Sequence, residues 1–189
     1  MKPARDLLSL LGSFSEIECY AAPVRWNELA EQECSVARTV AVVGDRWTLL
    51  VLREVFLGTR RFGDFLAHLG ISRPLLKERL DKLVEHRVLR RVPYQQRPLR
   101  REYRLTEKGL DLYPLITAMI TWGDRWMAGP EGPPLELVHR PCNHAIHPVP
   151  CCPECGEPVD ARQVEVRAGP GLGAASGPDV SHASEAETG

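Results

Sequence analysis

The strongest structural signal in the sequence is a pair of helical segments joined by a short turn at Gly70. Residues 62–70 read FGDFLAHLG, which predicts a short helix that ends at the glycine. Ser72 then opens a longer helix over about 73–86, with Pro74 in the first turn, where proline is tolerated. Two helices joined by a glycine-containing turn of this length predict a helix-turn-helix unit.

The segments before this pair predict a helical support for it. SVARTVAVV predicts a helix that starts at Ser35 and is stopped by Gly44. DRWTLLVLREVFLG predicts a second helix, with Asp45 as its N-cap and Gly58 just past its C-terminus. Because this second helix is apolar on almost every side, we expect it to lie in the core.

The segments after the pair predict a hairpin and one more helix. Two strand-like runs, VLRRVPYQ and LRREYRL, lie around QQRP and predict a basic hairpin over about 89–105. Thr106 caps a predicted helix over roughly 107–127, whose apolar residues cover more surface than one small domain needs to bury. Part of this helix is therefore expected to meet a partner chain. The order of elements predicts a mainly helical winged helix-turn-helix with a small β-hairpin, in the α+β class.

The composition changes after Gly129. GPEGPP predicts a linker, a Cys/His cluster follows it, and the end of the chain is rich in Gly, Ala, Ser and Pro and is expected to be disordered. The predicted divisions are an N-terminal extension (1–33), a winged helix-turn-helix domain (34–128), a linker (129–134), a Cys/His segment (135–167) and an acidic tail (168–189).

The net charge of −1 hides a separation of charges along the chain. A near-neutral chain would by itself argue against a nucleic-acid partner. Between Ser35 and Gly109, however, 17 Lys and Arg stand against 8 Asp and Glu, a net charge of +9, which leaves 7 against 17, or −10, elsewhere. This basic middle favours a nucleic-acid partner. No apolar run approaches the roughly 18 residues of a membrane-spanning helix, so we expect a cytoplasmic protein without a membrane partner.

Four motifs between Cys34 and Gly109 carry a family resemblance. GDRWTLLVLRE, FGDFLAHLGIS, LLKERLDKL and EYRLTEKG occur in an order and spacing that closely resemble the HxlR family of bacterial transcription regulators, distant relatives of MarR-type regulators. The resemblance implies a homodimer with packed terminal helices that binds a pseudo-palindromic double-stranded DNA operator near a promoter. Repression is the default expectation for such a regulator.

The predicted recognition helix has one apolar and one polar face. At 100° per residue, Leu76, Leu80 and Leu83 share a side with Leu75, whereas the first turn is exposed. That first turn is the part of a recognition helix that normally meets base edges in the major groove. The predicted DNA-facing residues are Ser72, Arg73, Pro74 and Lys77. The other interpretation is a merely solvated helix face.

Seven arginines and one acidic residue lie between Arg87 and Arg104. Three of the arginines gather near the tip of the predicted wing, where guanidinium groups enter the minor groove or hold flanking phosphates. The predicted wing contacts are Arg97, Arg100 and Arg101, whereas Arg90 and Arg91 at the strand base are also explained by solvation. Arg79 falls on the apolar side of the recognition helix, so we expect internal hydrogen bonds from it.

Cys34 stands directly before the first helix of the domain. Redox-sensing members of the family carry a cysteine at this position, which reacts with electrophiles or oxidants and releases DNA. Backbone N–H groups at a helix N-terminus stabilise a thiolate, whereas Glu31 and Glu33 oppose it here. Both a thiol sensor and an inert, packed thiol remain open.

Four of the six cysteines lie within residues 142–155. HRPCN and CPECG form two short ligand pairs at the spacing of a zinc ribbon. The predicted zinc ligands are His139, Cys142, Cys152 and Cys155. Such a site is structural, because four protein ligands leave no open position for a bound water.

Other side chains compete for these roles. His144 and His147 are alternatives to His139, and Cys151 is an alternative to Cys152. A disulfide from Cys142 to Cys152 or Cys155 is the other interpretation of the cluster.

Other classes of protein are less well supported. No nucleophile elbow, phosphate loop or dinucleotide fingerprint occurs, so the chain is not expected to be an enzyme. A protein-interaction module without DNA binding does not explain the basic middle. Small-molecule control remains an alternative, through an aromatic pocket at the dimer interface. Its predicted lining is Trp47, Phe56, Trp122 and Trp126.

Overall fold

The computed structural model describes residues 26–31, 33–167, 169 and 170. They fall into two units, of which one is Thr39–Val164 and the other combines residues 1–38 with 165–189. The described part of this second unit contains η2 (Trp26–Glu31) and the first residues of α1 (Ser35–Val43). Most of the predicted N-terminal extension, and the predicted tail from residue 171 on, lie outside the described residues.

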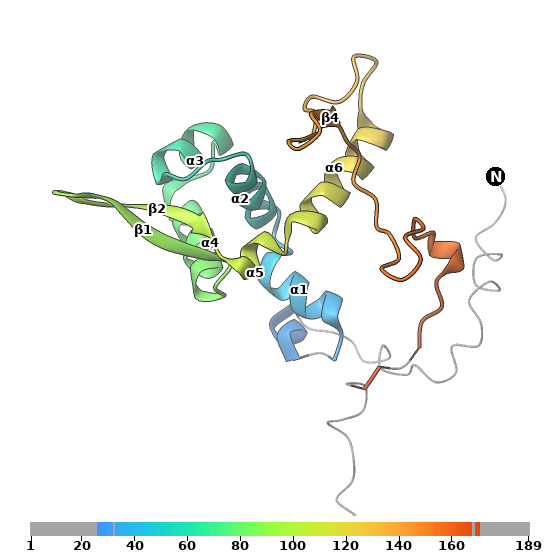
Figure 1. Ribbon diagram of the computed structural model, residues 1–189. Coiled ribbons are helices and arrows are strands. Elements are labelled where there is room, and N and C mark those ends of the chain that lie inside the picture. The colour runs from blue at the N-terminus through green and yellow to red at the C-terminus, as the bar shows by residue number, and fades with distance from the viewer. Residues whose placement is uncertain (1–25, 32, 168, 171–189) are drawn as a thin grey trace, which may run out of the picture. The chain divides into compact units, whose positions relative to one another are not determined.

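The unit Thr39–Val164 has the predicted order of elements (Figure 1). After the end of α1 it contains α2 (Arg46–Phe56), α3 (Phe62–Leu69), α4 (Arg73–Glu85), β1 (Leu89–Gln96), β2 (Leu99–Leu105), α5 (Glu107–Leu110), α6 (Tyr113–Met127), β3 (Val138–His139), β4 (His144–Ala145) and η3 (Ala161–Gln163). The mainly helical winged helix-turn-helix with a β-hairpin wing is therefore confirmed. Within the described residues, no helix is both long enough and apolar enough to cross a membrane.

Local signals set most helix ends. The Asp45 carboxylate accepts hydrogen bonds from the N–H groups of Trp47 and Thr48, which caps α2 as predicted. Gly70 ends α3 in the left-handed conformation, with φ 61°. Ser72 occupies the N-cap position of α4, where the helix was expected to begin, and its side chain makes no capping hydrogen bond.

The single helix expected over 107–127 is wrong. The structure divides it into α5 and α6, with Asp111 and Leu112 between them. Pro114 lies in the first turn of α6. Proline has no N–H for the helical ladder, and its ring clashes with the carbonyl four residues earlier, so a continuous helix is disfavoured at this point.

The hydrophobic core lies among α2, α3, α4 and the base of the wing. Its fully buried members are Val51, Leu52, Val55, Phe65, Leu76, Leu80, Leu83, Val88 and Leu89. The core position predicted for α2 is confirmed. Each such side chain contributes about 1.5–3 kcal/mol by leaving water, so α4 is held mainly by its three buried leucines.

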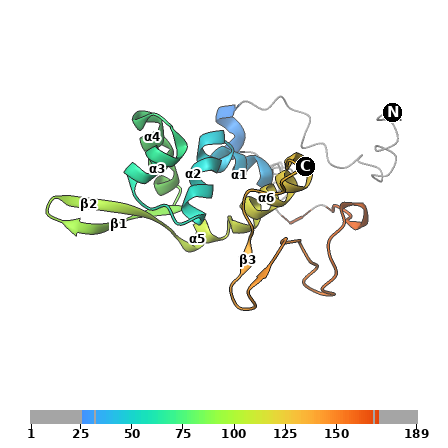
Figure 2. The same cartoon turned by 90° about the horizontal axis from the view of Figure 1, so that it is seen from above.

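The wing is an antiparallel hairpin that projects away from the helices (Figures 1 and 2). Its register runs from Leu89 opposite Leu105 to Gln96 opposite Leu99, with a bulge between Pro93 and Gln95. The base is fixed because the N–H of Tyr103 donates to the carbonyl of Arg60, at 2.8 Å.

The close contact of α5 with the residue before β1 generates the first prediction. A Cβ added at Gly109 would lie 2.2 Å from the carbonyl oxygen of Val88 and 2.9 Å from Cδ2 of Leu105. We expect Gly109→Ala to lower the free energy of unfolding by about 1–3 kcal/mol, because a backbone atom must move. Urea denaturation measures the difference.

Gly63→Ala in α3 is the matched control, because nothing lies within 4 Å of an added Cβ there. This control should leave the free energy of unfolding unchanged or raise it by up to about 1 kcal/mol. Equal effects of the two substitutions would contradict the steric explanation.

Candidate nucleic-acid interface

The first turn of α4 is exposed while its opposite face is buried. Leu76, Leu80 and Leu83 are fully buried, and the four predicted DNA-facing residues, Ser72, Arg73, Pro74 and Lys77, are exposed. The faces of α4 therefore follow the helical periodicity expected from the sequence. Within the described part of the chain, Arg73 makes no ion pair, so its guanidinium is available to an outside acceptor.

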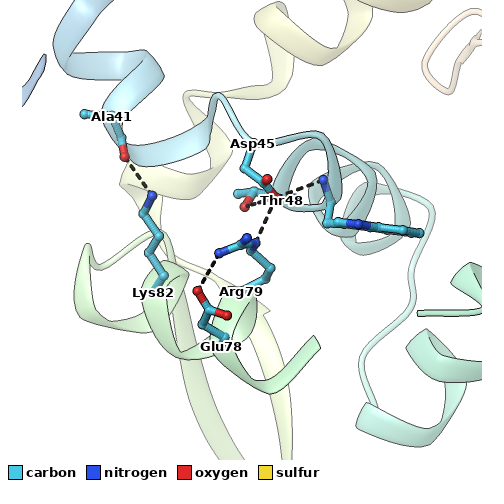
Figure 3. A network of polar contacts seen from close by, with 7 residues as sticks. Ala41, Asp45, Thr48, Glu78, Arg79 and Lys82 are labelled. Carbon is cyan, nitrogen blue, oxygen red and sulfur yellow. Dashed lines mark hydrogen bonds and ion pairs between the residues drawn. The ribbon is translucent and has the colours of Figure 1, made fainter. Parts of the chain in front are cut away.

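A polar network holds the back of α4 in place (Figure 3). Arg79 is only 19% exposed, and its Nε lies 2.8 Å from Oδ1 of Asp45. The ammonium of Lys82 donates to the carbonyl of Ala41 at 2.8 Å, near the end of α1. The expected internal role of Arg79 is confirmed. The bond from Lys82 joins residues 41 positions apart, and no local pattern predicts it.

Asp45 serves two elements at once. Its Oδ1 accepts the N–H bonds at the start of α2 and also faces Arg79 of α4. Burial acts to raise the pKa of this carboxyl, but the Thr48 N–H, the charge of Arg79 and the Trp47 N–H together lower it below its ordinary value. The ionised form therefore links the N-terminus of α2 to α4.

Asp81 connects α4 to the wing. Lys77 Nζ lies 2.5 Å from Oδ2 of Asp81, and Arg91 of β1 pairs with Oδ1. The hydrogen bond from Lys77 lowers the pKa of Asp81, and the charges of Lys77 and Arg91 add to this against a smaller effect of burial. The spacing of four residues between Lys77 and Asp81 is a sequence signal for this pair, although sequence reasoning assigned Asp81 no role.

The wing has arginines that form ion pairs near its base and arginines that form none near its tip. Arg91 pairs with Asp81, and Arg104 Nη2 lies 2.6 Å from Oε1 of Glu102. Near the tip, Arg97 lies in the turn, and Arg100 and Arg101 follow it on β2. These three are exposed, and none of them makes an ion pair with another described residue. The structure thus brings the three predicted wing residues together.

A hollow lies between α4 and the wing. Its volume is about 490 Å³, and it is lined by Lys77, Asp81, Arg91, Leu99, Arg101 and Tyr103. Three of its six lining residues are basic, so the hollow joins the first turns of α4 to the basic face of the hairpin.

Glu54 is a buried acid that sequence reasoning missed. It lies on α2, is 6% exposed, and accepts hydrogen bonds from Arg53, Thr59 and His68. Burial acts to raise the pKa of Glu54, but the hydrogen bonds from Arg53 and His68 outweigh it and lower the pKa. Since His68 belongs to α3, this cluster fixes the first helix of the helix-turn-helix to α2. The apolar character of α2 concealed it.

The aromatic residues of the expected small-molecule pocket have different roles. Phe56 packs against Tyr113, with ring centroids 5.2 Å apart, and Trp47 packs against the core. Trp122 and Trp126 are 60% and 66% exposed on α6. None of these four residues lines the cavity of about 280 Å³ that lies between α6 and residues 133–147. Small-molecule control stays a prediction.

The predicted cysteine and histidine residues make the contacts described here with residues close to them in the sequence. Cys34 lies directly before α1 and is partly buried, and its role as a sensor stays a prediction. His139 Nδ1 lies 3.2 Å from Sγ of Cys142. The N–H groups of Cys155 and Glu154 lower the pKa of the Cys152 thiol, and the Cys155 side chain adds to this.

The two ligand pairs do not form one cluster. Among the residues that the structure describes, no three His, Cys, Asp or Glu side chains gather closely enough to hold a metal ion. Cys142, Cys152 and Cys155 are not joined by disulfides. The four-ligand zinc site is therefore not assembled here and stays a prediction.

Comparison with known proteins matches residues 42–130 to the HxlR-like helix-turn-helix family. An uncharacterized HTH-type transcriptional regulator of Mycobacterium tuberculosis is 49% identical over 138 residues, which cover 73% of this chain and 87% of that protein. An uncharacterized HTH-type transcriptional regulator of Synechocystis is 38% identical over 95 residues, covering 50% of this chain and 70% of the relative.

Two solved structures are also similar. The crystal structure of PA1607, a proposed transcription factor, shares 35% identity with a TM-score of 0.66, over 73% of this chain and 96% of that one. PA1374 of Pseudomonas aeruginosa, another proposed transcription factor, shares 37% identity with a TM-score of 0.51, over 72% of this chain and 93% of that one.

The double role of Asp45 generates a prediction about pH. Asp45→Asn keeps an oxygen that can cap α2 but removes the charge that faces Arg79. We expect the free energy of unfolding at pH 7 to fall by about 1 kcal/mol. Because the folded-state pKa of Asp45 is depressed, its contribution is present above the ordinary value of 3.8 and is lost as the pH falls through the folded-state pKa.

Urea denaturation between pH 7 and about pH 3 should therefore show the two proteins converging in stability. Asp111→Asn is the control, because Asp111 is exposed and makes no ion pair with another described residue. A difference between wild type and Asp45→Asn that stays constant with pH would be inconsistent with an ion pair to Arg79.

Proposed function

Because this chain belongs to the HxlR family of helix-turn-helix transcriptional regulators, we propose that it binds a pseudo-palindromic operator as a homodimer and acts as a repressor. It is a DNA-binding transcriptional regulator and not an enzyme. The observation that carries the proposal is the exposed first turn of α4, which lies beside a wing with a basic tip. The orientation of α4 is fixed on its buried side by the contacts of Arg79 and Lys82.

The first turn of α4 enters the major groove in this proposal. Arg73 is exposed and makes no ion pair with another described residue. From this position its guanidinium donates two hydrogen bonds to the O6 and N7 acceptors of a guanine. Lys77 contacts a guanine or a phosphate after its ion pair with Asp81 breaks. Since an exposed ion pair contributes only about 0–1 kcal/mol, this exchange costs little.

The wing carries the contacts outside the major groove. Arg97, Arg100 and Arg101 hold flanking phosphates or enter the minor groove next to the α4 site. If each subunit neutralises three to five phosphates, log K falls with log salt with a slope of about −5 to −9 for the dimer.

The outer face of α6 supports a homodimer. Ile116 and Thr117 are buried in the core, whereas Leu115, Met119, Trp122 and Trp126 form an outer stripe that is 38–66% exposed. Their spacing of four, three and four residues places them on one side of the helix. A contiguous apolar stripe of this kind marks a protein interface, and a two-fold axis through it makes the stripe its own partner.

Arg73 generates the test of sequence reading. A duplex selected by the wild-type protein from a random pool serves as the probe, and fluorescence anisotropy at several salt concentrations measures affinity. We expect Arg73→Ala to weaken binding of the dimer by at least about 30-fold, because the substitution removes a bidentate base contact worth about 1–3 kcal/mol from each half-site. The double variant Arg97→Ala/Arg100→Ala should instead flatten the salt dependence.

Arg162→Ala is the control, because Arg162 is highly exposed but lies outside the winged domain. It should bind the selected duplex like the wild type. Unchanged affinity of Arg73→Ala together with an unchanged salt slope of the wing variant would refute the proposed interface.

The outer stripe of α6 generates the test of the dimer. We expect Trp122→Glu to convert a dimer into a monomer in sedimentation equilibrium, because the charge would be buried in the interface. The circular dichroism of the folded domain should stay the same, since Trp122 is exposed within a single chain. Lys108→Glu, an exposed charge reversal on α5 outside the stripe, is the control that should stay dimeric. A monomeric wild type would end the dimer proposal.

A further inference from the structure

The Cys/His segment contains two turns with the same backbone geometry. In the first, the N–H of Asn143 donates to the carbonyl of His139 at 2.7 Å. In the second, the N–H of Gly156 donates to the carbonyl of Cys152 at 2.8 Å. Asn143 and Gly156 both have left-handed φ, at 56° and 75°. Each turn therefore begins at one predicted ligand and closes at the residue after the next one, Cys142 or Cys155.

We propose that these two turns hold one structural zinc ion through His139, Cys142, Cys152 and Cys155. The proposal concerns a part of the chain outside the winged domain and does not depend on DNA binding. Thiolate and imidazole are the ligands that tetrahedral zinc prefers, and two ligands from each of two turns complete its coordination.

One contact favours His139 over the other histidines. The Nδ1 of His139 lies 3.2 Å from Sγ of Cys142, close to the roughly 3.5 Å between two ligand atoms on one tetrahedral zinc ion. His144 lies on β4 opposite His139, and His147 lines the cavity beside α6. Cys151 precedes the second turn, and its Sγ faces the carbonyl of Val149 at 3.7 Å.

The segment also lacks a core that would explain its turns. Of the described residues after Thr117, none is buried. Val138, Val149 and Val159 are each 45–58% exposed, and β3 and β4 contain two residues each. Short hairpins are marginal in water without a hydrophobic face. Small segments of this kind are normally stabilised by a metal ion or disulfides, and the cysteines of both turns are not disulfide-bonded.

The ion must draw the two turns together, because the described residues do not gather three metal-binding side chains. The nine connecting residues, 143–151, can extend to about 30 Å and leave enough chain to fold one turn back onto the other. Metal binding is then coupled to the ordering of residues 138–159, as in small zinc domains whose binding energy is folding energy.

Metal content of the full-length chain tests the proposal. The protein is purified under reducing conditions without chelator, and elemental analysis measures zinc. We expect about one zinc ion per chain. Replacement by Co²⁺ should give the visible bands of a tetrahedral site with thiolate charge transfer. Less than about half an equivalent of zinc, or Co²⁺ bands of an octahedral site, would overturn the proposal.

Paired variants test the ligand set. Cys142→Ser, Cys155→Ser and His139→Ala should lose the ion, whereas the controls Cys151→Ser, His144→Ala and His147→Ala should keep it. Loss of the ion from one of the three control variants, together with its retention in one of the three predicted-ligand variants, would overturn the assignment.

Limited proteolysis with and without chelator provides a readout that does not depend on the variants. Cleavage within residues 138–159 should increase at least several-fold when zinc is removed, while the winged domain stays resistant. Cleavage that does not change on chelation would overturn the coupling of metal binding to ordering.

Discussion

The contact between α4 and α2 is the interaction on which the other elements depend. Leu76, Leu80 and Leu83 are fully buried, so apolar burial supplies most of the attraction between the two helices. Apolar burial selects the inward face of α4, but because it has no direction it leaves small rotations and shifts of the helix loosely defined. Arg79 facing Asp45 and Lys82 bonded to Ala41 remove that freedom (Figure 3). The first turn of α4 is consequently presented to solvent in one orientation.

The acidic residues of the basic domain mainly fix the positions of cations. Asp45 faces Arg79, Asp81 takes Lys77 and Arg91, and Glu102 takes Arg104. The cations that lack such a partner among the described residues include those at the start of α4 and at the tip of the wing. The +9 charge of residues 35–109 is therefore unevenly distributed. The acidic residues connect α2, α4 and the wing through their paired cations. The arginines at the start of α4 and at the tip of the wing, which have no such partner among the described residues, are exposed, where they can reach a phosphate or a base edge.

Local signals made the helix ends predictable, and distant polar contacts were not predictable. Gly70 and Asp45 act on their own helix, so the residue type alone indicates where a helix ends or begins. The rotation of Arg79 followed from the helical period, because the period assigns a face without naming a partner. Lys82 and Glu54 depend on residues brought close only by the fold. The break before α6 has a local signal in Pro114, which the continuous apolar pattern of residues 110–126 masks.

The path from the wing to α6 bears on how two copies would be set on one operator. Gly109 of α5 lies against the carbonyl of Val88, and the Thr106 N–H donates to the same carbonyl at 3.1 Å. Ile116 then buries the inner face of α6 in the core. The outer stripe of α6 is thus joined to α4 and the wing through packed contacts and not through a flexible linker. A dimer formed by that stripe would hold its two recognition helices at a separation fixed by the fold, which a pseudo-palindromic site with defined half-site spacing requires.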